Sequence, residues 1–213
     1  MNQQRVLLAD DHPLFREALR AALSRLRPDF AVEQAESLDG ARQALLGDPK
    51  VELVLLDPKL PDCDGLMGLV ALRAEFPHAP VVVISAAEDA LAVSNAVAAG
   101  ALGFIPKSAS MATISKALRA ILAGDIWTPE HLVLTAPSHA VRALASLSPA
   151  QARLLPRLSR GLSNKRIADE FGVTEATVRA HVTATFRKLG VATRTQALLL
   201  IASELHTESS ASA

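Results

Sequence analysis

The segment Val51-Glu52-Leu53-Val54-Leu55-Leu56-Asp57 decides the fold of the first half of the chain. It is almost wholly apolar and ends in an acid, which is typical of a parallel strand that helices cover on both faces. Four more short runs rich in Leu or β-branched residues lie at 6–9, 30–34, 81–85 and 103–105. Helical patterns separate these runs at 14–26, 38–46, 66–76, 90–99 and 111–123. Five such strand–helix units predict an α/β domain with a doubly wound, five-stranded parallel sheet.

Length and composition indicate a two-domain protein with ordinary hydrophobic cores. The chain has 213 residues, of which 50% are hydrophobic and 21% are charged. No apolar run approaches the roughly 18 residues of a membrane span. The first residues have neither a long apolar segment nor a small-residue cleavage site. Because Cys63 is the only cysteine, an internal disulfide is excluded, and we expect a cytoplasmic protein with no membrane segment.

The second half of the chain has a different pattern. Residues 125–145 lose clear periodicity, which predicts a linker with a short helical piece around 139–145. Four helical patterns follow, at about 149–160, 164–171, 175–189 and 195–205, with breaks at Gly161, Gly172 and Gly190. Ser163 and Thr174 stand where N-caps belong. We therefore expect an α/β domain at 1–124, a linker at 125–145, an all-α four-helix domain at 146–206 and a flexible tail at 207–213.

Charge is distributed unevenly although the net charge is zero. Residues 1–125 hold 12 basic and 16 acidic residues, a balance of −4. Residues 126–213 hold 10 basic and 6 acidic residues, a balance of +4, and most of these bases lie between Arg153 and Arg194. A basic half is a candidate for binding nucleic acid, although an imbalance of this size is also ordinary scatter.

Reactive side chains follow the predicted strands of the first half. Asp10 and Asp11 follow the first strand, and Asp57 the third; Ser85 ends the fourth, and Lys107 follows the fifth. In a doubly wound sheet these ends meet at one edge. Clustered carboxylates favour Mg²⁺, and a carboxylate beside Mg²⁺ can attack phosphorus to form an aspartyl phosphate. A single acid at a strand end is ordinarily a solvated loop residue, but the whole set in register favours phosphoryl chemistry.

The helical pattern at 175–189 has two contrasting faces. Its apolar stripe is made of Val178, Val182, Thr185, Phe186 and Leu189. The opposite face carries only short side chains and two arginines, with no acid: Ala176, Arg179, Ala180, Thr183 and Arg187. Such a face can enter a major groove, with Arg179 reaching a guanine edge and Arg187 a phosphate. The residues alone leave open a plain helical bundle with a solvated basic face.

Four motifs of the first half closely resemble the receiver domain of two-component response regulators. They are Ala9-Asp10-Asp11-His12-Pro13, residues 56–65 around Asp57, Ile84-Ser85-Ala86 and Gly103-Phe104-Ile105-Pro106-Lys107. The resemblance implies a flavodoxin-like receiver with Asp57 as phosphoacceptor. It also implies Mg²⁺ ligands from Asp10, Asp11, Asp57 and the Lys59 backbone carbonyl. Lys107 is then the phosphate-pairing lysine. Ser85 and Phe104 are the switch residues, Phe104 turning inward when phosphate draws in Ser85.

The second half strongly resembles the LuxR-type helix-turn-helix domain, so the whole chain looks like a NarL/FixJ-family response regulator. The matching motifs are 161–168, 177–182 and 187–191. The resemblance implies base reading by Arg179, Ala180 and Thr183, and dimerisation through the last helix, at Leu198, Ile201 and Leu205. The expected DNA-contacting residues, from the faces and the resemblance together, are Ser163, Asn164, Lys165, Arg166, Thr177, Arg179, Ala180, His181, Thr183, Arg187 and Lys188.

Four positions depart from the family pattern. Pro58 removes an N–H beside Asp57 and fixes its own φ, which affects the loop geometry more than the role of Asp57. Ala150 and Gln151 stand where the family often has Arg-Glu, so one ion pair is expected to be missing. Pro156 falls within the first helix of the second domain, where we expect it to kink or shorten that helix.

The sequence thus predicts a phosphorylation-controlled transcription regulator that performs one self-phosphoryl transfer and is not a turnover enzyme. The expected partners are double-stranded DNA, a sensor histidine kinase, RNA polymerase and a second copy of the chain. A dehalogenase-like phosphatase would need an acid where Lys59 stands. A regulator gated by a small molecule would not need the set of Asp10, Asp11, Asp57 and Lys107. A phosphorylation-independent regulator remains a further alternative.

Overall fold

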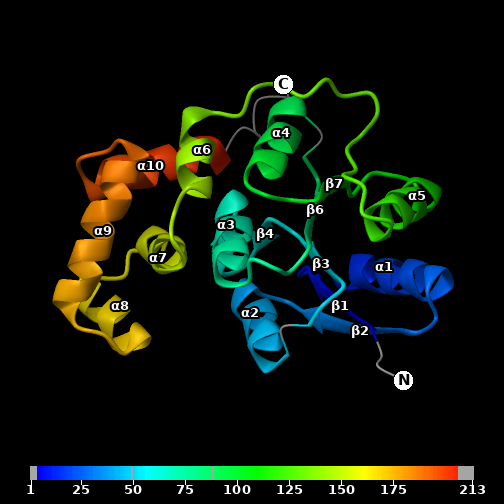
Figure 1. Cartoon of the computed structure of the whole chain (residues 1–213), viewed down its shortest axis with the longest axis horizontal. Coiled ribbons are helices and arrows are strands. Elements are labelled where there is room, and N and C mark those ends of the chain that lie inside the picture. The colour runs from blue at the N-terminus through cyan, green and yellow to red at the C-terminus, as the bar shows by residue number, and fades with distance from the viewer. Residues whose placement is uncertain (1–3, 49, 88, 206–213) are drawn as a thin grey trace.

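The first half of the protein is a five-stranded parallel sheet between two layers of helices (Figure 1). The computed structural model describes residues 4–48, 50–87 and 89–205. The strands are β1 (Gln4–Ala9), β2 (Phe30–Ala35), β3 (Leu53–Leu56), β6 (Val81–Ser85) and β7 (Gly103–Pro106), in the order β2-β1-β3-β6-β7. The helices are α1 (Pro13–Leu26), α2 (Leu38–Gly47), α3 (Leu66–Glu75), α4 (Ala90–Ala98) and α5 (Met111–Leu122). The predicted doubly wound sheet is confirmed.

Alternation along the strands builds two cores from one sheet. Leu53 and Leu55 of β3 join a cluster with residues of α1 and α5, whereas Val54 and Leu56 join a cluster with residues of α2, α3 and α4. Successive side chains of a strand point to opposite faces, so a central strand must be apolar throughout. This is why the apolar run that ends in Asp57 forms the middle of the sheet.

A small hairpin that the sequence did not predict follows β3. It consists of β4 (Lys59–Leu60) and β5 (Cys63–Asp64), which pair antiparallel. The nearby Asp62 carboxylate accepts hydrogen bonds from the backbone N–H groups of Leu38, at 2.7 Å, and Asp39, at 2.9 Å. Since these N–H groups have no partner within the first turn of α2, Asp62 acts as a cap supplied from a distant part of the chain.

The predicted linker is packed against the first domain along much of its length. Trp127 forms a bridge beside β7, since its carbonyl accepts from Phe104 N–H at 2.9 Å and its N–H donates to the Leu102 carbonyl at 3.2 Å. Further on, Thr135 N–H donates to Ser94 Oγ of α4 at 2.9 Å. The predicted short helix is present as α6 (His139–Ala145), and Val141 in it is fully buried. Residues 125–145 therefore form a structural bridge between the two halves.

The second half contains the four predicted helices. They are α7 (Pro149–Ser159), α8 (Asn164–Phe171), α9 (Glu175–Leu189) and α10 (Arg194–Leu205). The predicted caps are confirmed: Ser163 and Thr174 accept backbone hydrogen bonds, and Gly172 and Gly190 adopt left-handed conformations with φ of 65° and 71°. These glycines suit a conformation that is costly for other residues.

The two departures from the family pattern in α7 affect only the local structure of this helix. The expected shortening at Pro156 is wrong, because α7 runs for 11 residues with Pro156 inside it, while the expected kink stays a prediction. Where the family often has an ion pair, Gln151 instead completes a capping box. Its Oε1 accepts from Ser148 N–H at 3.0 Å, and Ser148 Oγ accepts from Gln151 N–H.

The two halves meet where α7 packs against α3, while α9 lies on the outer side of the helical half (Figure 1). Leu155 and Ala152 of α7 are fully buried in the same cluster as Leu72 of α3. At the edge of this contact Arg42 donates to both oxygens of Glu75, at 2.7 and 2.8 Å, and Arg153 Nε lies 3.8 Å from Glu75. Among the described residues, no helix is long and apolar enough to cross a membrane.

Candidate functional site

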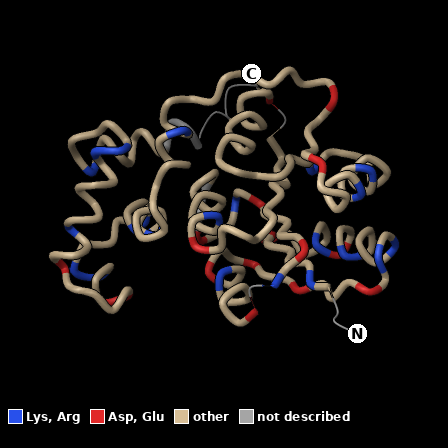
Figure 2. The backbone as a smooth tube through the Cα atoms, viewed as in Figure 1, with Lys and Arg blue, Asp and Glu red and all other residues tan. Residues whose placement is uncertain are grey.

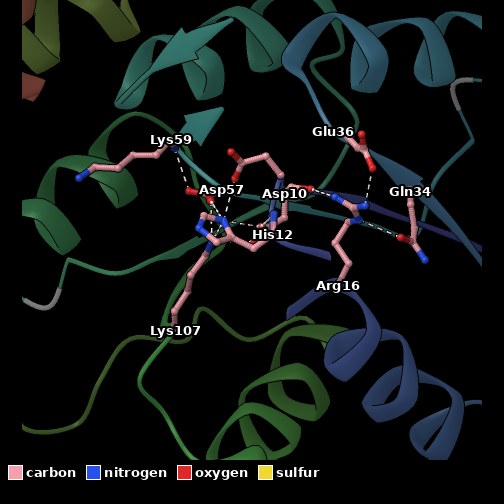
Figure 3. A network of polar contacts seen from close by, with 9 residues as sticks. Asp10, His12, Arg16, Gln34, Glu36, Asp57, Lys59 and Lys107 are labelled. Carbon is pink, nitrogen blue, oxygen red and sulfur yellow. Dashed lines mark hydrogen bonds and ion pairs between the residues drawn. The ribbon is translucent and has the colours of Figure 1, made fainter. Parts of the chain in front are cut away.

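The carboxyl ends of β1, β3 and β7 bring two acids and a lysine into contact (Figure 3). Lys107 Nζ lies 2.6 Å from Asp57 Oδ2 and 2.8 Å from Asp10 Oδ2. Both aspartate side chains are only 3% exposed, and that of Lys107 is 16% exposed. The parallel topology predicted this convergence, because strands β1, β3 and β7 all end at the same edge of the sheet.

Asp57 is held by backbone and side-chain contacts. Its backbone N–H donates to the Ala9 carbonyl at 2.8 Å, and its Oδ1 accepts from Lys59 N–H at 2.8 Å. Pro58 is buried and does not prevent this local turn. Burial raises the pKa of the Asp57 carboxyl, although the hydrogen bonds from Lys107 and Lys59 act in the opposite direction. Asp57 is thus a carboxylate whose ionised form depends on a neighbouring cation.

Lys107 is the cation that balances this site. Burial lowers the pKa of its ammonium group, but the hydrogen bonds to Asp10 and Asp57 prevail and leave this pKa raised above its ordinary value. The ammonium group also lies 5.1 Å from the centre of the Phe15 ring, within range of a cation–π contact. Lys107 is therefore charged at neutral pH and is directed at the oxygen atoms of the two acids.

Two residues of this site were not among the predicted site residues. His12 Nδ1 lies 2.7 Å from Asp11 Oδ1 and 3.2 Å from Asp10 Oδ1. Arg16 is buried and donates to the Asp10 carbonyl at 2.5 Å, while Gln34 and Glu36 hold its other nitrogen atoms (Figure 3). Arg16 therefore fixes the backbone that carries the acids. The position of His12 directly after the two acids was a signal for it, whereas a single arginine in a helix carries no such signal.

The predicted switch residues lie near the ends of the adjoining strands. Ser85 at the end of β6 is 1% exposed, and its Oγ accepts from Ala87 N–H at 3.1 Å. Phe104 in β7 is 2% exposed and packs in the cluster that contains residues of α3 and α4. The outward resting position that the resemblance implied for Phe104 is not seen, because its ring is already inside the protein.

The acids fit a divalent cation. Ligand atoms of Asp10, Asp11, His12 and Asp57 all lie within 4.8 Å of one another. Asp11 Oδ1 is buried and makes no hydrogen bond, whereas Asp10 Oδ2 is buried beside the Lys107 ammonium group, at 2.8 Å. Buried carboxylate oxygen atoms without hydrogen-bond donors need a cation to offset their charge, and oxygen ligands suit Mg²⁺.

The helix-turn-helix of the second half presents most of the expected DNA-contacting residues to solvent. Arg179, Ala180, Thr183 and Arg187 are all exposed on α9, whereas His181 is half-buried. The expectation of a face without acids needs a correction, because Glu175 in the first turn accepts from Arg179 at 3.1 Å. The remaining expected residues around the turn are exposed or half-buried: Ser163, Asn164, Lys165, Arg166 and Thr177.

Lys188 differs from the other expected DNA contacts. Its ammonium group donates to the Ser146 carbonyl at 2.7 Å, at the end of α6. In this arrangement Lys188 ties the end of α9 to the bridge between the two halves. Figure 2 shows the basic residues of the second half distributed along several helices, so no single helix carries all of its positive charge.

The three residues of the last helix that were expected to form a dimer contact differ in burial. Ile201 is 3% exposed and belongs to the protein's own core, where helices of both halves meet. Leu198 is half-buried, and the Leu205 side chain lies outside the described residues. Leu199, which was not predicted as a dimer contact, is 65% exposed. Ile201 is thus unavailable to a partner in this conformation.

Both halves match known protein families. The family described as the response regulator receiver domain matches residues 6–119, and the luxR family of bacterial regulatory proteins matches residues 145–201. The chain is 38% identical to the glycerol metabolism activator of Pseudomonas putida over 206 residues, which cover 92% of this chain and 93% of that protein. It is 32% identical to the nitrate/nitrite response regulator protein NarL of Escherichia coli K12 over 208 residues, which cover 93% and 95%.

A solved structure shares the fold of the whole chain. It is RcsB from Salmonella enterica serovar Typhimurium, bound to promoter P1flhDC in the presence of the phosphomimetic BeF3−. The TM-score is 0.55 and the identity 21%, over 95% of this chain and 99% of that chain.

A doubly wound sheet with this acid–lysine site, followed by a helix-turn-helix half, defines a response regulator. The chain belongs to the response regulators that join a receiver to a LuxR-type DNA-binding domain, as NarL does. It is a phosphorylation-controlled DNA-binding regulator of transcription rather than an enzyme.

Proposed function

We propose that Asp57 is the phosphoacceptor and that a sensor histidine kinase or a small phosphodonor supplies the phosphoryl group. The observation that carries this proposal is the contact of 2.6 Å between the buried Asp57 carboxylate and the Lys107 ammonium group. One Asp57 oxygen attacks phosphorus, the bond from phosphorus to the donor breaks, and the donor leaves with the electron pair. Lys107 then pairs with the phosphoryl oxygen atoms, and the Ser85 hydroxyl donates a hydrogen bond to one of them.

Mg²⁺ is the cofactor that best fits the acids. Asp10, Asp11, Asp57 and the Lys59 backbone carbonyl would hold it, and it would neutralise negative charge on the transferring group. Arg16 keeps the Asp10 backbone in place through its hydrogen bond to the Asp10 carbonyl. These residues supply positioning and charge balance, which is what a loose phosphoryl-transfer transition state requires.

The output is binding of double-stranded DNA by a pair of α9 helices. Arg179, Ala180 and Thr183 read bases, while Arg187 and the start of α8 contact phosphates. The reading face is exposed although the two halves pack through α7. Phosphorylation therefore need not uncover α9. We infer that it acts on the pairing of two copies on adjacent half-sites, where RNA polymerase can be recruited. Chromosomal DNA is the target, so the site of action is the cytoplasm.

Phosphorylation of the purified full chain tests this proposal. We expect acetyl phosphate with Mg²⁺ to add one phosphoryl group by intact mass, and Asp57→Asn to abolish both this addition and the gain in DNA affinity. Asp64→Asn, in the hairpin after β3, is the matched control. A phosphoryl group of normal stability on the Asp57→Asn protein would assign the acceptor elsewhere. Equal DNA binding with and without phosphorylation would favour a phosphorylation-independent or small-molecule-gated regulator.

A further inference from the structure

The imidazole of His12 lies among the acids of the phosphoryl site. His12 is the N-cap residue of α1, yet its side chain makes no capping hydrogen bond. Its Nδ1 lies 2.7 Å from Asp11 Oδ1, 3.2 Å from Asp10 Oδ1 and 3.8 Å from Asp57 Oδ2 (Figure 3). The ring therefore faces all three carboxylates although it is 65% exposed, and its Nδ1 also lies 3.4 Å from Lys107 Nζ.

The contact between His12 and Asp11 is short but is not a hydrogen bond. Asp11 Oδ1 is buried and makes no hydrogen bond, although His12 Nδ1 is only 2.7 Å away. Asp10 Oδ2 is also buried, and the Lys107 ammonium group lies 2.8 Å from it. Two ligands at right angles around a cation, each about 2.1 Å from it, lie about 3 Å apart. The spacing of Nδ1 from Asp11 Oδ1, 2.7 Å, is close to that separation, while Nδ1 is hydrogen-bonded to Asp10 Oδ1 at 3.2 Å.

We propose that His12 Nδ1 is a metal ligand, so that this receiver holds its cation in a mixed imidazole–carboxylate site. This inference rests on the proposed function of the phosphoryl site, and it adds a preference of that site for particular metal ions. Imidazole suits the later first-row transition ions, whereas Mg²⁺ and Mn²⁺ are better matched by carboxylate, carbonyl and water oxygen atoms. The site therefore binds Co²⁺ more tightly than an all-oxygen site would, with a smaller gain for Mn²⁺, and it gains nothing from His12 toward Mg²⁺.

The substitution His12→Asn tests this preference while keeping a good N-cap for α1. The matched control is His78→Asn, because His78 is exposed and precedes β6, at the opposite end of the strands. Calorimetric titration of the full chain with Mn²⁺, Co²⁺ and Mg²⁺ measures the affinities. We expect His12→Asn to weaken Co²⁺ binding about tenfold or more, Mn²⁺ binding less than Co²⁺ binding, and Mg²⁺ binding less than about twofold. His78→Asn should change none of them.

Pulsed electron paramagnetic resonance of the Mn²⁺-bound protein gives a second readout. We expect nitrogen modulation from a directly bound imidazole in the natural protein and in His78→Asn, and its loss in His12→Asn. Equal weakening of all three ions, or no nitrogen modulation in the natural protein, would overturn the role of His12. If no divalent ion binds the natural protein at all, the metal-assisted phosphorylation itself is wrong. These outcomes distinguish the case in which His12 is not a metal ligand from the case in which the proposed function is wrong.

Discussion

The phosphoryl site and the reading face of α9 carry function in opposite ways. The first is assembled from the ends of three strands, and its Asp10 and Asp57 side chains are 3% exposed. The second is one face of a single exposed helix. A buried site is determined by topology, because each strand end has only one place in the sheet. An exposed helix face is determined by periodicity alone, but the contacts of its basic side chains depend on neighbours such as Glu175, which pairs with Arg179, and the Ser146 carbonyl, which accepts from Lys188.

The largest expected effect separates buried from exposed positions within α10. Ile201→Glu places a charge in the core between the two halves and should destabilise the fold by about 3–5 kcal/mol. Leu199→Glu is the matched control, since Leu199 is 65% exposed. It should change stability by no more than about 0.5 kcal/mol. Denaturant unfolding measures both. Equal stability of the two variants would mean that Ile201 is free for dimerisation, as the sequence first suggested.

Substitution of Lys107 tests the function of the buried phosphoryl site. Lys107→Ala removes a charge-assisted contact to the phosphoryl group, worth about 1.5–3 kcal/mol. The variant should accept phosphate slowly and then bind DNA like the unphosphorylated protein. Lys116→Ala is the control, because that lysine pairs only with exposed Glu130 among the described residues. Phosphate-stimulated DNA binding in Lys107→Ala at the natural level would exclude Lys107 from the mechanism.

Sequence patterns predicted the parts of the molecule that follow from local order along the chain. The apolar run at 51–56 and the acids after it predicted the sheet and its reactive edge, and Gly172 and Gly190 marked the helix ends. Contacts between distant segments were not predictable in this way. The burial of Ile201 depends on how the two halves pack, and the bridge at Trp127 depends on a free sheet edge at β7.

Within the phosphoryl site, the difference between local sequence order and contacts of distant segments explains which residues were not predicted. Asp57 and Lys107 follow strands, and strand ends converge by rule. Arg16 lies in α1 and reaches Asp10 only because the helix packs beside the first strand. Glu175 was assigned to neither face of α9, yet its side chain extends to Arg179 across one turn. Helical periodicity thus assigns a residue to a face of the helix, but it does not show which neighbouring residues a long side chain can contact.

On the exposed region, two arginines of α9 should differ in role. Arg179 is near the start of the helix, where side chains reach base edges, and Arg187 is two turns further on. Arg179→Ala should cost about 1–3 kcal/mol on the specific site and relax base preference at one position per half-site. Arg187→Ala should weaken specific and scrambled DNA alike and lower the salt slope by about one. Titration against both duplexes at several salt concentrations measures this. Equal losses on both duplexes for Arg179→Ala would make it a phosphate contact.

The smallest expected effect concerns Glu175, the acid beside the reading face. It lies 3.1 Å from Arg179, and both side chains are largely exposed, so the pair itself is worth less than about 1 kcal/mol. If Arg179 reads a base as proposed, the pair must open on DNA, and the remaining carboxylate is then repelled by phosphates. Glu175→Gln should therefore tighten binding by less than about 1 kcal/mol, and less so at high salt.

The double variant Glu175→Gln, Arg179→Ala separates the two causes of this effect. If Glu175 acts by holding Arg179, its substitution has no effect once Arg179 is removed, and a double-mutant cycle shows coupling. If Glu175 acts by repelling phosphates, the gain in DNA affinity from Glu175→Gln persists in the double variant. This gain is then the same on specific and on scrambled DNA. Weaker binding by Glu175→Gln would instead mean that the pair keeps Arg179 extended for base reading. The exposed face would then be preorganised by a neighbouring charge, as Lys107 preorganises the carboxylates of the buried site.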